Sequence, residues 1–263
     1  NKKESTAATS VEVSGAGQIT DGVLGDQQPP ARGARSNPAT YLKFFDDIRT
    51  LFAETVDARI RKFGPGQFSF NQPGGRCETC EGLGRLTIDV PLLANVTSVC
   101  PECQGRCYRK EILDIKVRSR SIAEVLDLTV REAFRFFRAQ PAIEKKLKLL
   151  LDVGLGYLRL GQPMDTLAGG EVQRLKLAGH LASNRKGGYL FLLTEPTAGL
   201  HAADVAELMN CFDRLLSAGH SLIVIEHDLE LIRSCDHVIE LGDGSIVTQG
   251  TPEEVAAVAQ QLD

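Results

Sequence analysis

Two cysteine pairs carry the clearest chemical signal in the sequence. Cys77 and Cys80 form one Cys-x-x-Cys motif, and Cys100 and Cys103 form a second, with 19 residues between the pairs. Each such turn holds two thiolates close enough to share one metal ion, and two turns facing each other across a hairpin complete a tetrahedral shell. We expect one structural zinc ion per chain, because four thiolates leave no position open for catalysis. Cys107 is a competing ligand with a less regular spacing.

A second group of residues has the order expected of ATP chemistry. A glycine-glutamate motif is expected to begin a helix, whose free N–H groups suit a phosphate anion; it comprises Leu167, Ala168, Gly169, Gly170 and Glu171. An apolar strand then ends at Glu195, which could polarise an attacking water. The next strand ends at His227, which could reach a terminal phosphate. The order and spacing of the three pieces, more than any one of them, indicate this chemistry.

Composition bounds the class of protein. The chain has 263 residues, of which 43% are hydrophobic and 24% charged, as is ordinary for one large or two smaller globular domains. No apolar run approaches the roughly 18 residues that span a bilayer, so no membrane partner is expected. Seven cysteines, four of them in close pairs, fit a reducing compartment and predict a cytoplasmic protein.

The net charge of −4 means that any nucleic-acid binding must come from a local basic face. Basic residues near the cysteine pairs are the candidates for contact with DNA phosphates, and a solvated surface is the alternative. The candidates are Arg61, Lys62, Arg76, Arg85 and Arg106.

The first half of the chain predicts mostly helices around the cysteine pairs. We expect a poorly ordered lead-in over residues 1–25, with one short strand at Val11–Val13. A helix should start at Ser36-Asn37-Pro38 and bury a face of large apolar groups through Phe52. Residues 86–99 look strand-like around a turn near 94–95, and Ile112–Val117 alternates like a strand. Capping boxes at Ser121 and Thr129 predict two short helices, followed by a longer helix from Pro141 to about Gly154.

From Gly161 onward, strands alternate with helices. We expect buried strands at Tyr189–Leu193 and Ser221–Ile225, a helix over His201–Ser217, and a hairpin that pairs 237–241 with 245–249. Continuous apolar strands separated by helices predict a mainly parallel sheet covered on both faces.

The motifs also carry a family resemblance. The glycine-glutamate motif, Leu190–Thr197 and Glu226-His227 resemble the signature, Walker B and switch-histidine motifs of ABC-type ATPases. Five further stretches resemble the C-terminal half of the UvrA family, the damage-sensing component of excinuclease ABC in bacterial nucleotide excision repair. They are Arg35–Tyr41, Phe68–Asn71, Gly74–Cys77, Asp152–Leu155 and Leu160–Gln162, and the resemblance runs from about Asp26 to the end.

The resemblance implies a fold and its divisions. The fold class is α/β, an ABC-ATPase-like parallel sheet with helices, plus an inserted helical signature region that carries the zinc-binding module. After the lead-in, residues 26–165 would form the Q-loop and helical signature region, with the zinc module at about 68–118. Residues 166–263 would form the ABC ATPase subdomain. Asp26–Pro29 resembles the Q-loop, which would place Gln27 near the metal and the attacking water.

The resemblance also implies an activity and partners. The family binds duplex DNA, especially damaged DNA, and couples this binding to ATP with Mg²⁺ at composite sites. It does not cut DNA, but loads an excinuclease B-like helicase, and it forms a homodimer.

The sequence departs from the family pattern at the nucleotide site. The chain contains no Gly-x-x-x-x-Gly-Lys-Ser/Thr phosphate loop (Walker A), Thr194 stands where the family has Asp, and Ala168 stands where it has Ser. These departures count against independent ATP hydrolysis. They favour a composite site in which another ABC half supplies Walker A.

Two other functions fit parts of the sequence. A non-enzymatic zinc module that binds protein or DNA would explain Cys77–Gly84, which also resembles the zinc repeats of a chaperone family that binds unfolded protein. A transporter-type nucleotide-binding protein would explain the region from Thr194 onward. The first leaves the ATPase motifs unused, and the second leaves the cysteine module without a role.

Overall fold

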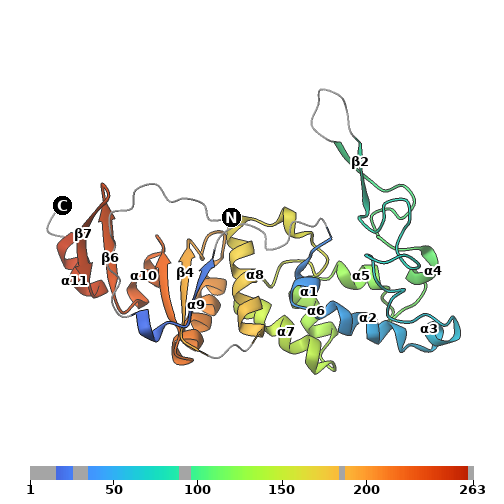
Figure 1. Ribbon diagram of the computed structural model, residues 1–263, viewed down its shortest axis with the longest axis horizontal. Helices are drawn as coiled ribbons and strands as arrows, with labels where there is room; N and C mark the ends of the chain where they lie inside the picture. Colours follow the sequence, from blue (N-terminus) through green and yellow to red (C-terminus); the bar gives the residue numbers. More distant parts are fainter. Residues whose placement is uncertain (1–15, 26–34, 89–95, 184–186, 260–263) are drawn as a thin grey trace.

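A three-stranded parallel sheet organises the second half of the molecule (Figure 1). The computed structural model describes residues 16–25, 35–88, 96–183 and 187–259. Strands β1 (Asp21–Gly25), β4 (Tyr189–Thr194) and β5 (Ser221–Ile225) lie in the order β1-β4-β5. Gly25 is level with Leu193, and Thr194 is level with Ile225, so all three strands end at one edge. Helix α8 (Gly169–Ala182) contacts β1, and α9 (Ala202–Ser217) contacts β5. The predicted α/β class is confirmed.

Strand β1 corrects the lead-in predicted over residues 1–25. A short 3-10 helix, Ala16–Gln18, and β1 both lie inside that range. The strand is short and begins and ends with residues of low strand propensity, so local pattern gave no sign of it; its order comes from pairing with β4. The Val11–Val13 strand and Gln27 lie outside the described residues.

The helix predicted from Ser36 to Phe52 is wrong in one respect, because it is broken. Helix α1 (Pro38–Tyr41) ends before Lys43, whose φ is 58°, and α2 (Phe45–Ala53) starts two residues later. The predicted start is confirmed, since Asn37 and Thr40 form a reciprocal cap. The break turns both Phe44 and Phe45 into the core, where a single helix would have separated them by about 100°.

Most other helices of the first half match their predicted starts. Reciprocal caps open α5 (Ile122–Leu126) and α6 (Val130–Phe136), and α7 runs over Pro141–Asp152. Helix α3 (Val56–Ile60) was not predicted. The strand predicted at Ile112–Val117 is wrong, because α4 (Lys110–Leu113) occupies its start and buries Ile112.

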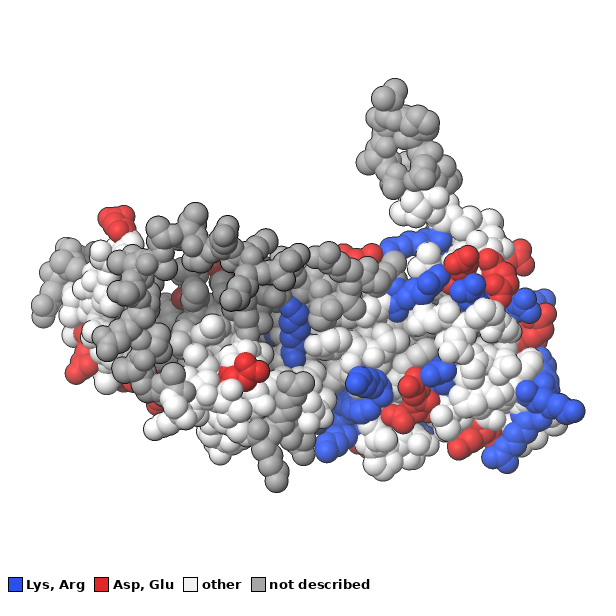
Figure 2. All heavy atoms as spheres, in the orientation of Figure 1, with Lys and Arg blue, Asp and Glu red and all other residues white. Residues whose placement is uncertain are grey.

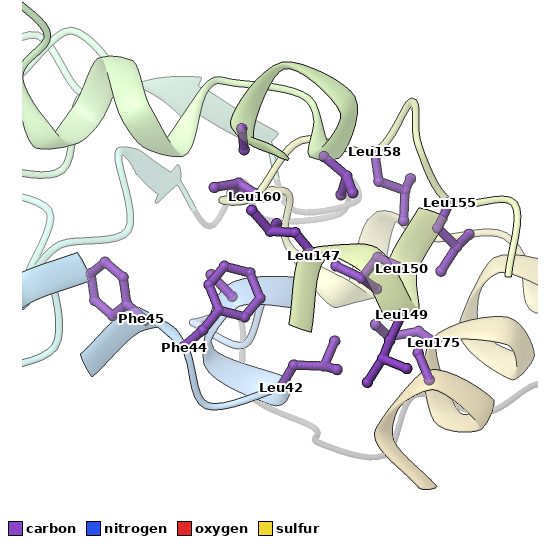
Figure 3. Close-up of a cluster of buried hydrophobic side chains, with 14 of the residues drawn as sticks. Leu42, Phe44, Phe45, Leu147, Leu149, Leu150, Leu155, Leu158, Leu160 and Leu175 are labelled. Atoms are coloured by element: carbon purple, nitrogen blue, oxygen red, sulfur yellow. The ribbon is translucent and has the colours of Figure 1, made fainter. Parts of the chain in front are cut away.

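One apolar core joins the helical region to α8 (Figure 3). Leu147 and Leu150 of α7 are fully buried between the α1–α2 segment and the loop that leads to α8. Leu175 of α8 and Leu160 of the loop are equally buried. Burial of each such side chain stabilises the fold by about 1.5–3 kcal/mol, so this core fixes the position of the signature helix relative to the helical region.

Two antiparallel hairpins lie near opposite ends of the molecule (Figure 1). Strands β2 (Arg85–Ile88) and β3 (Val96–Val99) pair beside the cysteine motifs. Strands β6 (Val238–Gly242) and β7 (Ser245–Gly250) form the predicted second hairpin, against which α11 (Pro252–Ala259) packs. A short α10 (Leu229–Ser234) follows β5. Within the described ranges, none of the helices is long and apolar enough to cross a membrane.

Strand β5 differs from the buried strand predicted at Ser221–Ile225. Ile223 is 55% exposed and Ile225 is 58% exposed, and the sheet order leaves β5 at an edge of the described sheet. The apolar composition was read correctly, but it did not reveal that one side of the strand is uncovered.

Candidate metal centre and nucleotide site

The four paired cysteines meet in one buried cluster. The sulfur atoms of Cys77, Cys80, Cys100 and Cys103 all lie within 4.8 Å of one another. The Sγ atoms of Cys77 and Cys100 are 3.9 Å apart, and those of Cys80 and Cys103 are 3.6 Å apart. A tetrahedral zinc ion with Zn–S bonds of about 2.3 Å requires sulfur atoms about 3.8 Å apart. The donor set therefore fits such an ion in both number and spacing.

Two similar turns build the cluster. Each cysteine pair is followed by a residue with positive φ and then a glycine, at Glu81-Gly82 and at Gln104-Gly105. At Gly82 a side chain is impossible, because a Cβ atom there would lie 1.8 Å from the backbone oxygen of Phe70. The turns are tied together by the Cys77 N–H, which donates to the Cys107 carbonyl over 2.8 Å. Backbone geometry thus brings the two pairs face to face.

The electrostatics of the cluster favour a bound cation. Burial raises the pKa of the Cys103 thiol to about 12, and the negative charge of a Cys80 thiolate raises it further. A divalent ion would offset both effects and hold the four groups as thiolates. Cys107, the competing candidate, is not part of the cluster; its thiol donates to the Gly105 carbonyl over 3.4 Å.

The glycine-glutamate motif forms the N-terminus of α8, as predicted. Ala168 is the N-cap residue, and its N–H donates to Glu171 Oε2 over 2.8 Å. The hydroxyl of Tyr157 donates to Glu171 Oε1 over 2.8 Å. Alanine offers no side-chain acceptor, so the reciprocal half of this cap is missing. The motif is therefore held from one side only.

Glu195 and His227 come together at the carboxyl edge of the sheet. Glu195 follows β4 with a left-handed φ of 48°, and its N–H donates to the carbonyl of Ile225 at the end of β5 over 2.7 Å. Its Oε1 lies 4.0 Å from His227 Nε2. The two side chains are 50% and 85% exposed, so this face of the site is open to a large ligand. Thr194, at the end of β4, is exposed at the same edge.

Glu226 is a site residue that sequence reasoning missed. Its Oε1 accepts the N–H of Thr197 over 2.7 Å and also the Thr197 hydroxyl, while Oε2 accepts the N–H groups of His227 and Asp228 over 2.8 and 3.3 Å. Burial raises the pKa of the Glu226 carboxyl, but these hydrogen bonds outweigh it and hold the pKa below its usual value. The carboxylate joins the loops that carry Glu195 and His227. Only its place beside His227 marked it in the sequence.

Arg174 is a second residue that the sequence did not single out. It lies in α8 with 1% of its surface exposed, and its Nη1 donates to the carbonyls of Pro196 and Ala198 over 2.8 and 3.1 Å. The other end of the fork reaches the Tyr157 hydroxyl over 3.4 Å. The guanidinium thereby fixes the signature helix against the loop after Glu195. A charged residue between buried Val172 and Leu175 was the only available sign.

The five predicted DNA-contacting residues do not form one unpaired patch. Arg61 pairs with Asp114, Arg76 with Glu78, and Arg85 with Asp165, at 3.5, 3.3 and 3.0 Å. Arg106 donates to the neutral amide oxygen of Gln104 over 2.9 Å, and Lys62 is exposed. Figure 2 shows basic side chains interspersed with acidic ones over this part of the molecule. The local basic face is therefore partly neutralised.

The parallel sheet and the motifs at its edge define the class of the fold as that of an ABC-type ATPase with an inserted cysteine module. The particular relatives share the name UvrABC system protein A. The chain is 49% identical to the protein of Methanothermobacter thermautotrophicus, over 98% of this chain and 27% of the relative. It is 52% identical to that of Thermus thermophilus, over 88% of this chain and 25% of the relative. A search against protein-family models gave no match.

A solved structure gives the same result. UvrA2 from Deinococcus radiodurans superposes with a TM-score of 0.82 and 46% sequence identity, over 91% of this chain and 30% of that protein. The chain thus spans about a quarter of the length of the curated relatives named above. The resemblance to the UvrA family is confirmed for a segment of this size, and so is the fold class that it implied.

Proposed function

We propose that this chain is the part of a DNA-damage recognition protein of nucleotide excision repair that couples ATP to duplex DNA binding. The observation that carries the proposal is the similarity to UvrABC system protein A along nearly the whole chain. The local geometry supports it, because a cysteine cluster suited to a metal and an ABC-type edge with Glu195 and His227 are joined by one core.

At the nucleotide site, we assign the catalytic roles to Glu195 and His227. ATP bound with Mg²⁺ would supply the phosphoanhydride bond. Glu195 would orient and deprotonate the attacking water, and His227 would donate a hydrogen bond to the terminal phosphate. Gln27 and the motif Leu167–Glu171 would contact nucleotide and metal, as they do by resemblance. Thr194 offers a neutral hydroxyl to Mg²⁺ in place of a carboxylate, which predicts weak metal binding in this half.

The missing phosphate loop would come from another ABC half. The exposed apolar edge at β5 supports this, since Ile223 and Ile225 are the kind of residues that a further parallel strand and its helix would cover. A composite arrangement also gives the signature of this chain a nucleotide to act on, held by the opposite half.

The metal would be zinc, one ion per chain, with a structural role. It would hold the module that presents basic residues to duplex DNA. Lys62 and Arg106 could meet phosphates directly, whereas Arg61, Arg76 and Arg85 would exchange their carboxylate partners for phosphates. Damaged duplex would be the preferred ligand. An excinuclease B-like helicase and a second copy of the protein are the further partners proposed, and the cytoplasm is the proposed location.

The first test is equilibrium binding and turnover of ATP with Mg²⁺. The chain alone and the chain together with a Walker A-containing half are compared, each with its Glu195→Gln variant. We expect turnover only in the pair, and its loss with Glu195→Gln while ATP binding persists. Turnover that Glu195→Gln leaves intact would contradict the assigned role.

The second test is the salt dependence of binding to a labelled duplex, with and without a lesion. Each released phosphate contact contributes about −0.9 to the slope of log K against log salt. Affinity that does not fall with added salt would remove DNA phosphates from the proposal.

A further inference from the structure

A cleft separates the cysteine module from the helical region. It has a volume of about 410 Å³. Gly82, Leu83 and Gly105 line it from the module, while Leu126, Gly161 and Pro163 line it from the helical side. Two ion pairs bridge the two sides: Arg35 with Glu81 at 3.3 Å, and Arg85 with Asp165 at 3.0 Å. The cleft is therefore formed by folded elements that are tied together, and its volume lies in the range of small-molecule sites.

The polar lining of the cleft is dominated by three guanidinium groups. Arg35, Arg106 and Arg159 line it, together with one carboxylate, Asp127. Arg159 donates to the backbone oxygen of Asp127 over 2.9 Å, and Arg106 to the amide oxygen of Gln104, so both use neutral partners and keep their charge uncompensated by these bonds. The Nε–H of Arg35 is buried and meets no acceptor among the described residues. The cleft thus holds more cationic donors than anionic acceptors.

These features point to a ligand with several anionic oxygens. The guanidinium fork matches phosphate geometry in two parallel hydrogen bonds, and a phosphate presents enough oxygens for three such groups, which a carboxylate does not. The buried Arg35 Nε–H would gain the acceptor that it lacks. The apolar lining from Leu83, Leu126 and Pro163 suits the organic part of a phosphate ester rather than a bare ion.

We propose that this cleft is a binding site for a phosphate ester, held by Arg35, Arg106 and Arg159. The ester belongs either to the backbone of a nucleic acid or to a free phosphorylated nucleotide. The proposal rests in part on the proposed function, since Arg106 is shared with the DNA-contacting surface, but the cleft is separate from the edge that carries Glu195 and His227.

The test uses deoxythymidine 3′,5′-bisphosphate as the free probe, thymidine as its uncharged counterpart, and a short labelled duplex as the polymer. Binding is measured by titration calorimetry and fluorescence anisotropy on the zinc-loaded chain. We expect Arg106→Gln and Arg159→Gln each to weaken binding about tenfold, the effect of losing one charge-assisted contact. Arg131→Gln, an exposed charge outside the cleft lining, is the matched control and should leave binding unchanged.

Asp127→Asn gives the opposite sign. Removal of the one carboxylate that lines the cleft should tighten binding, a result that damage to the fold would not produce. Thymidine should not bind, because the recognised group is the phosphate.

The outcomes separate the two sources and the two proposals. Loss of duplex affinity without binding of the bisphosphate supports the nucleic-acid source. Binding of the bisphosphate with unchanged duplex affinity supports the free nucleotide, and it would stand even if the chain bound no DNA. If both cleft variants match Arg131→Gln with every probe, the site does not exist.

Discussion

The cysteine module and the ATPase half solve the same problem, the placement of a few reactive side chains, by different means. In the module, four ligands from two adjacent turns meet around one point, and the four cysteines form a cluster of their own beside a single partly buried leucine, Leu86. In the ATPase half, Glu195 and His227 are positioned by a sheet whose strands are far apart in the sequence. One site is complete within about 30 residues; the other depends on long-range pairing and leaves an apolar edge exposed at Ile223 and Ile225.

The comparison teaches where each site is vulnerable. The module has little apolar core, so its order should depend on the metal. The nucleotide site has a large core behind it, so its weak points are the few polar contacts that connect α8, the loop after β4 and the loop after β5. Four substitutions test this division, and they follow from the largest expected effect to the smallest.

Loss of the metal should affect the module most. Zinc binding contributes about 10–16 kcal/mol in small zinc-dependent domains, so Cys100→Ser should abolish binding and unfold the module while the sheet stays intact. Metal content per chain and hydrogen exchange at Arg85–Ile88 and Val96–Val99 measure the two effects. Cys107→Ser is the matched control and should retain one metal ion, because Cys107 lies outside the cluster. A Cys100→Ser protein with full metal content would refute the four-cysteine site.

Arg174→Met should be the most damaging polar change in the ATPase half. It leaves the buried carbonyls of Pro196 and Ala198 without their donor, which costs about 2–4 kcal/mol. Chemical denaturation of the metal-loaded protein measures the loss. Arg131→Met, which removes a guanidinium that is 63% exposed, should change stability by less than about 0.5 kcal/mol. Equal losses in the two variants would show that the buried fork does not secure α8.

Glu226→Gln should have a smaller, pH-dependent effect. The carboxylate accepts four hydrogen bonds, whereas the amide presents its NH₂ group to some of the same donors, so stability near neutral pH should fall by about 1 kcal/mol. Because the folded-state pKa of Glu226 lies below its unfolded value, the contribution of the carboxylate is complete above the unfolded pKa. It is lost as the pH falls through the folded pKa.

Unfolding curves of both proteins from pH 7 down to the acid range check the Glu226 prediction. The gap between wild type and variant should close on the acid side. Glu230→Gln, in the next helix, should show no comparable closing. A gap that is constant with pH would mean that the carboxylate charge is not what joins the two loops.

Prediction from sequence succeeded where the signal was local. The capping boxes at Ser121 and Thr129 and the two Cys-x-x-Cys turns specify their own geometry within a few residues, and the structure contains all four. It failed where distant pairing decides the outcome. Strand β1 is ordered by β4, from more than 160 residues away, and the exposed side of β5 depends on what lies beside the strand rather than on its composition.

The candidate sites divide in the same way. The sequence pointed to Glu195 and His227 as strand-end residues, but the partners that hold their loops, Arg174 and Glu226, emerged only from the three-dimensional contacts. The basic residues were counted correctly as charges, yet Asp114, Glu78 and Asp165 neutralise three of them through contacts that span up to 80 residues. A charge count along the chain does not contain that information.

Ala168→Ser is the smallest change and the one that separates stability from nucleotide chemistry. Ala168 already has the extended backbone of an N-cap residue, with φ −67° and ψ 156°, and its side chain is exposed, so a serine hydroxyl could accept from the Glu171 N–H without rearrangement. The completed capping box should stabilise the chain by about 0.5–1 kcal/mol. The isosteric pair Ala168→Thr and Ala168→Val is the control, since only threonine can accept the hydrogen bond. The gain should appear in thermal unfolding of the chain alone, whereas any gain in ATP turnover requires the half that holds the nucleotide. If serine improved turnover in the pair but not stability, the hydroxyl would act on the phosphate and not on the helix.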